Sequence, residues 1–277
     1  CNRQFGLSNR DLKYFLYRST LQGTIPTGLE DDIINGGETT TEKRLTAVMQ
    51  MSEDYISGLL ITSIVDRLNY LMDSPLVNNK IAHLSILRII YKISLSSKTL
   101  IETYIADCPG LINLMVKKFL CIQWPLPGDN DISIYTELAS WTLRILRNIS
   151  LCSRKMALGL IELNIIDVIS RFIFCGVFST RDIKKGVKDT SLICTLILQA
   201  RSWQLLQTFL DYGLSGQFID NYRLPLYEYC KDIFGLDAHI NNNSIKLDGE
   251  LSKSMIFSAV HETQTSFLNF LTSLIES

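Results

Sequence analysis

The sequence predicts an all-α protein, and within that class an α-solenoid of armadillo- or HEAT-like helical repeats. Apolar residues recur at steps of three and four along most of the chain, which is the period of an α-helix. No series of alternating strand-like runs is present, and no Asn-Gly hairpin turn separates two apolar runs. One helical pattern is also repeated later in the chain, and such repetition is typical of solenoids.

The predicted helices follow one another along the chain. The stripe over 58–72 carries Leu60, Ile64 and Leu68, and Pro75 after it cannot continue a helix. The next stripe runs over 77–95. Further helical patterns run over 111–121, 134–151, 165–174, 190–212, 217–234 and 251–275. Several of these helices are apolar on more than one side, which indicates helices packed between neighbours.

Composition divides the chain into five segments. We expect a helical segment over 1–27 and a flexible linker over 28–54, which is rich in acidic residues, Gly and Thr. The helical-repeat array is predicted over 55–236. The Asn-rich, polar stretch 237–250 is predicted as a loop, and 251–277 as a C-terminal helix.

The repeated pattern supports the solenoid within the all-α class. Leu87 to Lys98 reads LRIIYKISLSSK, and Leu143 to Arg154 reads LRILRNISLCSR. Each copy is followed by a short break and by a second apolar helix, as in armadillo and HEAT repeats. Chance similarity between helices rich in Leu and Ile is the alternative explanation.

Composition indicates a folded chain without a membrane span. Of the 277 residues, 47% are hydrophobic and 20% are charged, whereas disordered chains carry more charge and fewer aliphatic residues. No stretch of about 18 apolar residues lacks a charge, so we expect no membrane contact. The seven cysteines form no CxxC pair, which favours buried free thiols over disulfides or zinc ligands. We therefore expect the chain in the nucleus and cytoplasm.

No motif in the sequence indicates catalysis, a metal or a cofactor. The chain lacks a GxSxG elbow, a GxxxxGK[ST] phosphate loop and a GxGxxG turn. Its three histidines lie far apart, and His83 is expected to be structural. We therefore predict a protein that is not an enzyme and that needs no cofactor. An enzyme whose site assembles from distant helices remains an alternative.

Charge gathers in the middle of the chain, although the net charge is only -1. Residues 141–188 contain nine basic and three acidic residues. Such a strip can bind an acidic peptide or a nucleic-acid backbone, although nucleic acid is less favoured because aromatic residues do not alternate with the basic ones. Ordinary solvated helix surface is the other interpretation. The candidate partner-binding residues of this strip are Arg144, Arg147, Arg171, Lys184 and Lys185.

The three tryptophans have different expected roles. Trp124 lies in the loop-like segment QWPLPGDN and can either anchor a partner or fold back over the preceding helix. Trp141 and Trp203 lie within helices and are expected in the core.

Five blocks of the sequence stand out: DYISGLLITSIVDRLNYLM (Asp54 to Met72), CPGLINLMVKKFLCIQW (Cys108 to Trp124), LRILRNISLCSRKMALGLI (Leu143 to Ile161), VISRFI (Val168 to Ile173) and ARSWQLLQTFLDYGLSGQFI (Ala200 to Ile219). In this order they are similar to the carboxy-terminal helical region of the RNA polymerase II-associated protein 1 family. The blocks span about three-fifths of the chain, and none is a catalytic signature.

The resemblance implies an adaptor that supports the assembly, nuclear import and transcription of RNA polymerase II through protein–protein interaction. Expected partners are polymerase subunits and assembly factors, including small GTPases and chaperone-linked cofactors. Two alternatives stay open beside it. One is a solenoid of the transport-receptor type with other cargo, and the other is a helical array that binds nucleic acid.

Overall fold

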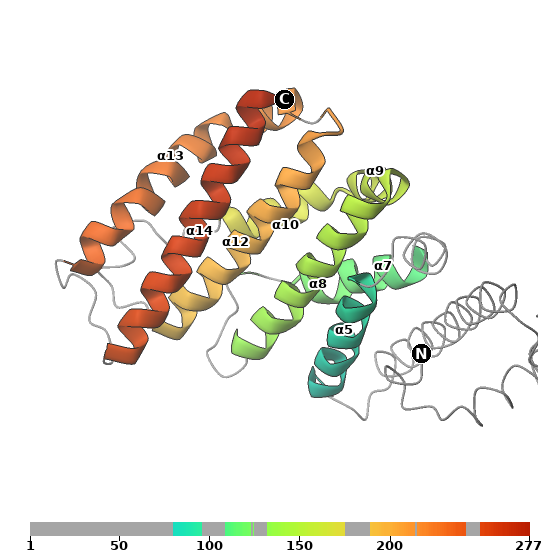
Figure 1. The fold of residues 1–277 in the computed structure, drawn as a ribbon, viewed down its shortest axis with the longest axis horizontal. Helices are drawn as coiled ribbons and strands as arrows, with labels where there is room; N and C mark the ends of the chain where they lie inside the picture. The colour runs from blue at the N-terminus through green and yellow to red at the C-terminus, as the bar shows by residue number, and fades with distance from the viewer. Residues whose placement is uncertain are drawn as a thin grey trace, which may run out of the picture. The chain divides into compact units, whose positions relative to one another are not determined.

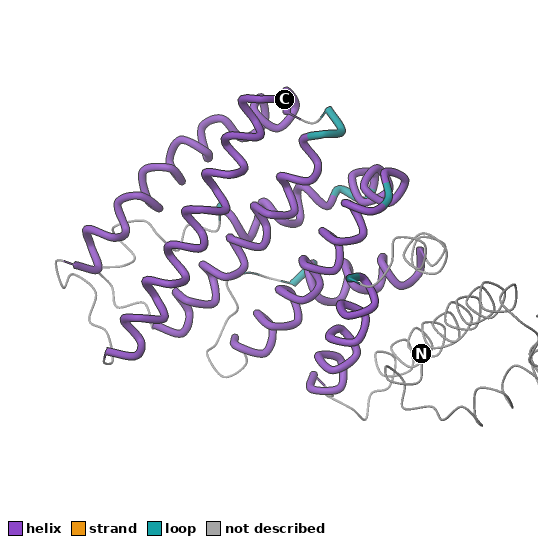
Figure 2. The backbone as a smooth tube through the Cα atoms, in the orientation of Figure 1, coloured by secondary structure: helices purple, strands orange, loops and turns teal. Residues whose placement is uncertain are grey.

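The computed structural model describes residues 80–95, 109–122, 124, 132–174, 189–213, 215–241 and 250–277, which all belong to one compact unit, Val65–Ser277. Every regular element in these ranges is helical (Figures 1 and 2), so the all-α prediction is confirmed for them. The segments predicted over 1–27 and 28–54 and the helix predicted over 58–72 lie outside the described residues.

The described elements, labelled as in Figure 1, are almost all those that the apolar period predicts. They are α5 (Lys80–Ser94), α7 (Pro109–Met115), the π-helical turn η2 (Val116–Leu120), α8 (Ile132–Cys152), α9 (Arg154–Glu162), α10 (Ile165–Ile173), α12 (Asp189–Leu210), α13 (Ser215–Asn241) and α14 (Glu250–Glu276). The sequence did not predict α9 as a separate helix. Ser153 adopts an extended backbone with φ -137° and ψ 113°, which ends α8 and starts the new helix one residue later.

The helices form two layers. In the first layer α12 packs against both α8 and α14, and α8 packs against α5, so the order is α5, α8, α12, α14 (Figure 1). In the second layer η2 packs against α8 and α10, α10 packs against α12, and α13 packs against α14. The chain passes from one layer to the other at nearly every turn, with the short α9 joining α8 to α10.

Neighbouring helices of the first layer run in the same direction. Between α5 and α8, Arg88 bonds to Glu137, and further along both helices Asn148 donates to Ser94 over 3.0 Å. Between α12 and α14, Gln204 donates to Ser266 and Gln207 to Ser273, both at 3.0 Å. In both pairs the numbers of the bonded residues increase in the same direction along the two helices, so the helices are parallel. The chain therefore returns through second-layer elements before each new helix of the first layer begins.

The two copies of the repeated pattern share a buried position at the start and another near the end. Leu87 of α5 and Leu143 of α8, which are the first residues of the two copies, are both fully buried. The serines near the end of each copy, Ser94 and Ser150, are also buried. The sequence similarity therefore corresponds to equal burial at these two positions, whereas Ile89 is exposed and its counterpart Ile145 is fully buried.

An aromatic core lies where α10, α12, α13 and α14 meet. Trp203 is fully buried, as predicted, and its ring centroid lies 4.8 Å from those of both Phe267 and Phe270. The buried amide of Gln199 joins three helices, since it donates to the Ile173 carbonyl over 2.9 Å and accepts from the Tyr229 hydroxyl over 3.0 Å. Buried polar groups need such partners to offset the loss of water.

The loop predicted over 237–250 is wrong at its start, because α13 continues to Asn241. Leu236 and Ile240 are buried one turn apart, and Gln264 of α14 donates to the Asp237 carboxylate over 2.8 Å. Packing against α14 therefore extends the helix through a stretch whose local composition favours a loop. In the described part of the chain, no helix is both long enough and apolar enough to cross a bilayer.

Candidate functional site

Three arginines occupy equivalent positions on three successive helices of the first layer. Arg88 of α5 and Arg144 of α8 are the second residues of the two repeated sequence copies. Arg201 follows at a nearly equal interval on α12, and its charge acts on Arg144 across the contact between α8 and α12. We call Arg88, Arg144 and Arg201 the arginine row.

The indole of Trp141 lies between two members of the arginine row. The guanidinium of Arg144 lies 5.1 Å from the ring centroid of Trp141 and that of Arg88 lies 5.9 Å away, both within cation–π range. Tyr91 packs edge-on against the same indole at 4.9 Å. Trp141 is half-buried and lies between two guanidinium groups, so the prediction that it belongs to the core is wrong.

Carboxylates pair with the two outer arginines of the row. Arg88 lies 3.1 Å from Glu137, and both side chains are about half exposed, so water weakens this pair. Arg201 lies 2.6 Å from Glu262 of α14. The Arg201 side chain is only 13% exposed, which makes its pair with Glu262 the better shielded of the two.

Arg144 is the arginine of the row that has no carboxylate partner among the described residues. Partial burial of its guanidinium and the nearby charge of Arg201 both lower the pKa of Arg144. A lowered pKa means that the surroundings oppose the positive charge. A carboxylate from another molecule would relieve that opposition.

Hydrogen bonds between neighbouring helices hold this face in place. Asn148 to Ser94 joins α8 to α5, and the bonds from Gln204 and Gln207 to α14 continue beyond the Arg201–Glu262 pair. The side chains of the arginine row therefore stand on helices whose register is fixed, and a partner would meet a preformed surface.

The structure brings only one of the predicted basic residues into this site. Arg147 is half-buried, and its Nε atom has no hydrogen-bond partner in the described part of the chain. Arg171 is exposed on α10, which belongs to the second layer, so it does not share a face with Arg144. Lys184 and Lys185 lie outside the described residues.

Arg88 and Arg201 were not predicted from the sequence, because the charge of a continuous stretch does not identify a row that takes one residue from each of three distant helices. The available signal was the repeated pattern itself, because it aligns Arg88 with Arg144.

Trp124 does not stand free as an anchor. It is half-buried, and its ring packs edge-on against Phe172 of α10 with 6.0 Å between centroids. The folded-back interpretation therefore describes it better, and the ring that it packs against belongs to α10.

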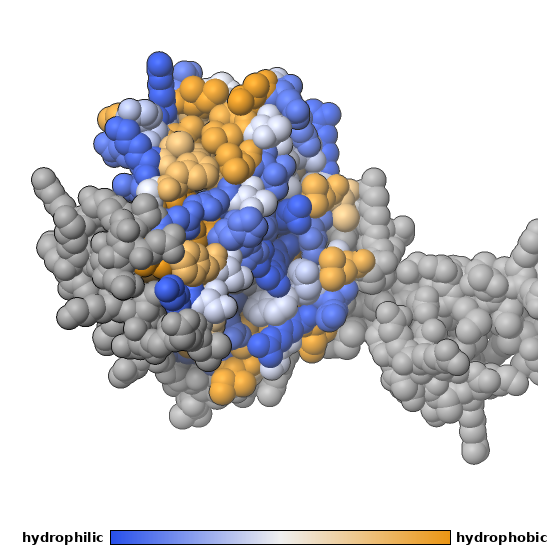
Figure 3. Space-filling model, turned by 60° about the vertical axis from the view of Figure 1, so that its left-hand side comes forward, coloured by the Kyte–Doolittle hydropathy of each residue, from blue (hydrophilic) through white to orange (hydrophobic). Residues whose placement is uncertain are grey.

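Apolar side chains also reach the surface on α13 and α14. Figure 3, which turns this side toward the viewer, shows hydrophobic areas interrupted by hydrophilic ones. Scattered exposed apolar residues are normal on a protein surface and carry no group that fixes the orientation of a ligand. The exposed examples on these two helices are Ile219, Leu224, Tyr227, Phe234, Met255, Leu268 and Ile275.

Reactive side chains are few in the described ranges. No group of three or more His, Cys, Asp or Glu residues there is arranged to hold a metal ion. The ring of His83 packs edge-on against Phe119 at 5.7 Å, which suits a structural role. Of the four described cysteines, Cys194 is buried, which raises its pKa, but Cys121 is exposed and departs from the expected burial.

Searches of known protein families, of curated proteins and of solved structures find none that matches this chain.

Proposed function

We propose that the chain is a non-enzymatic scaffold that binds other proteins, and that its helices form an armadillo- or HEAT-like solenoid. Three observations support the solenoid: alternation between two layers, parallel helices within the first layer, and burial of the first leucine and the late serine in both copies of the repeated pattern. Stacked repeats present broad surfaces that suit extended or bulky protein partners.

The observation that carries the proposal is the guanidinium of Arg144, which pairs with no carboxylate of the described residues, beside the half-buried ring of Trp141. Arg and Trp are the residues most enriched among the energetic centres of protein interfaces. A partner carboxylate placed against Arg144 would gain a charge-assisted hydrogen bond in partly desolvated surroundings.

The pattern of charge favours a protein over a nucleic acid. A duplex presents one negative charge per about 1.7 Å and therefore matches continuous positive charge. Here Glu137 and Glu262 interrupt the arginine row. A protein surface can place an acidic residue against Arg144 and a neutral or basic residue against each glutamate.

We further propose that the partners belong to the assembly, nuclear import and transcription of RNA polymerase II, in the nucleus and cytoplasm. The support for this setting is the resemblance of the five sequence blocks to the RNA polymerase II-associated protein 1 family. Polymerase subunits, small GTPases and chaperone-linked cofactors are then the partners to test.

The test is capture of purified RNA polymerase II and of its assembly intermediates on the immobilised chain, with Arg144→Glu and Arg171→Glu variants. We expect polymerase subunits on the wild-type chain and on Arg171→Glu, because Arg171 lies on the other layer. Arg144→Glu should reduce capture at least about tenfold, since a like charge then faces the partner carboxylate.

Two results would contradict parts of this proposal separately. Equal capture by all three proteins would exclude the arginine row as the binding surface. Capture of no polymerase component by any of them would exclude the polymerase setting, and arginine-dependent binding of an import cargo would favour the transport-receptor alternative.

A further inference from the structure

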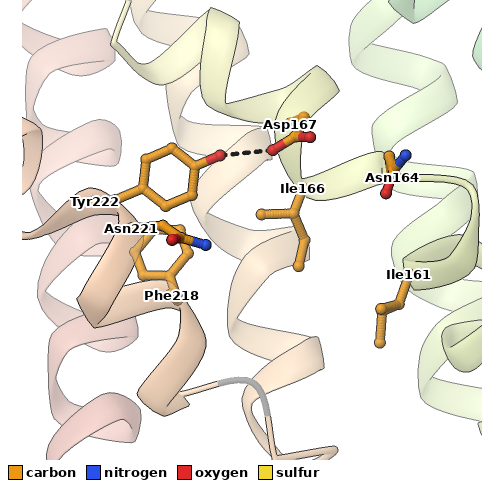
Figure 4. A pocket seen from close by; sticks show the side chains of 7 residues that line it. All are labelled: Ile161, Asn164, Ile166, Asp167, Phe218, Asn221 and Tyr222. Atoms are coloured by element: carbon orange, nitrogen blue, oxygen red, sulfur yellow. Dashed lines mark hydrogen bonds between the residues drawn. The ribbon is translucent and has the colours of Figure 1, made fainter.

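A small pocket opens between the second-layer helices α10 and α13, away from the arginine row. Its volume is about 180 Å³. Figure 4 shows side chains from the turn between α9 and α10 on one side and from the first turns of α13 on the other. The residues that line it are Ile161, Asn164, Ile166, Asp167, Phe218, Asn221 and Tyr222.

The backbone holds one wall of the pocket rigidly. Asn164 adopts the left-handed conformation, with φ 55° and ψ 34°, which Asn tolerates better than most residues. Its N–H donates to the Ile161 carbonyl over 2.9 Å, and its own carbonyl accepts from the Asp167 N–H over 3.1 Å. The turn therefore fixes Asp167 in the first turn of α10.

Aromatic rings form the opposite wall. Phe218 and Tyr222 lie one turn apart on α13, with 4.9 Å between ring centroids. Phe174 stacks on Tyr222 at 5.6 Å, with 16° between the ring planes. The Tyr222 ring is thus held between two neighbours, and its hydroxyl donates to Asp167 Oδ1 over 2.8 Å, which joins the two walls (Figure 4).

The polar groups of the pocket offer several hydrogen-bond acceptors and one negative charge, that of Asp167. A carboxylate offers about four acceptor positions, so the bond from Tyr222 leaves most of the capacity of Asp167. Asn164 and Asn221 add amide oxygens, and none of the seven lining residues is basic. A cation therefore suits the pocket, and an anion does not.

Size and shape narrow the choice of cation. Pockets for whole small-molecule ligands usually have volumes of about 300–1,000 Å³, so this one suits a single side chain. A guanidinium is planar and presents a fork of donors that matches a carboxylate, whereas the ammonium group of lysine is a point charge. Because Phe174 and Phe218 lie against the Tyr222 ring, the fork and not ring stacking favours arginine over lysine.

We propose that this pocket binds an arginine side chain of a partner protein, with the guanidinium bonded to Asp167. The arginine belongs to a polypeptide, because the pocket has no basic residue to bind the carboxylate of a free amino acid. This site differs from the arginine row in its layer and in the sign of its charge, so either proposal can fail alone.

The test is a nuclear magnetic resonance titration of the full chain labelled at isoleucine methyl groups, because Ile161 and Ile166 line the pocket. The probe is N-acetyl-arginine methylamide, and the matched control is N-acetyl-citrulline methylamide, which has the same shape without the charge. We expect saturable shifts of the Ile161 and Ile166 signals with the arginine probe and much smaller shifts with the citrulline probe. Free arginine should bind no more tightly than the capped probe.

Two variants complete the test. Asp167→Asn should weaken binding of the arginine probe by about tenfold or more, because it removes the charged acceptor. Asn221→Asp adds a carboxylate at an exposed lining position and should strengthen binding of arginine but not of citrulline. Isoleucine signals remote from the pocket, such as that of the buried Ile256, report whether each variant keeps its fold.

Several results would overturn the proposal. Equal shifts with the arginine and citrulline probes would show that charge is not recognised. The absence of shifts at Ile161 and Ile166 up to the solubility limit of the probe would show that no guanidinium enters. Unchanged affinity in the folded Asp167→Asn variant would remove the carboxylate from the site.

Discussion

Arg201 and Glu262 form an ion pair, with 2.6 Å between the Nη1 and Oε1 atoms, that joins α12 to α14 at one end of the arginine row. The Glu262 carboxylate also acts on Arg144, where its attraction partly offsets the effects of burial and of Arg201. The same glutamate thus stabilises the fold and reduces the positive charge that a partner would meet.

Glu262→Gln should separate these two effects. We expect a loss of about 1–2 kcal/mol in the free energy of unfolding, because the mostly buried Arg201 loses its partner while Glu262 itself is well solvated. The affinity for an acidic partner should rise, since the positive charge near Arg144 is less neutralised. Denaturant titration and binding at several salt concentrations measure both quantities.

The matched control for that change is Glu276→Gln, which removes the same charge from an exposed position near the end of α14. It should alter neither stability nor binding appreciably. If Glu276→Gln raised the affinity as much as Glu262→Gln, net charge and not the arginine row would control binding.

Leu146→Ala should destabilise the fold by about 2–5 kcal/mol, because Leu146 is fully buried on α8 and its truncation leaves a cavity. Leu151→Ala, on the same helix at an exposed position, should change stability by about 0.5 kcal/mol or less. Chemical denaturation followed by circular dichroism measures the difference. Similar values for both variants would contradict the burial of Leu146 between helices.

Gln199→Leu tests the buried amide that joins α10, α12 and α13. The variant removes the amide that bonds to the Ile173 carbonyl and to the Tyr229 hydroxyl, and we expect a loss of about 1–3 kcal/mol in the free energy of unfolding. Tyr229→Phe removes only one of these bonds and should cost less. Thermal unfolding of the two variants and of their combination measures the coupling, and a stable Gln199→Leu would show that the bonds contribute little.

Stability should fall as the pH rises through the alkaline range, since burial raises the pKa of the Cys194 thiol. In the unfolded chain this thiol ionises at its ordinary pKa of about 8.5, whereas in the folded chain it keeps its proton to higher pH. Its contribution is therefore complete below pH of about 8.5 and is lost as the pH rises through the folded pKa.

The free energy of unfolding of Cys194→Ala should depend less steeply on pH than that of the wild type between about pH 8.5 and 10. Tyr222, whose pKa is also raised by burial, contributes in the same direction once the pH passes about 10. Identical slopes for the two proteins below pH of about 10 would contradict the raised pKa of Cys194.

Most helix positions could be predicted because a helix is defined by neighbours three and four residues apart. The stripe over 77–95 became α5, and the pattern over 190–212 became α12. Helix ends were less accurate where a distant residue decides them. Nothing local to Asp237 indicates that Gln264 will bond to it and that α13 will continue to Asn241.

The candidate site could be predicted only in part. Arg144 was identified from the excess of basic residues around it, but its neighbours in space are Arg88 and Arg201 on other helices. Arg171, only a short distance further along the chain, lies in the other layer. The summed charge of a stretch of sequence cannot distinguish Arg144 from Arg171, because it ignores the layer to which each helix belongs.

The sequence by itself determined the helical class, the order of the helices and the repetition of one buried pattern, since these depend on the local spacing of apolar residues. Tertiary structure alone decided that Trp141 lies between two arginines, that Trp124 covers α10, and that Asp167 meets Tyr222. These contacts depend on the register between helices that are distant in the chain, and that register is fixed by the packing of the whole core.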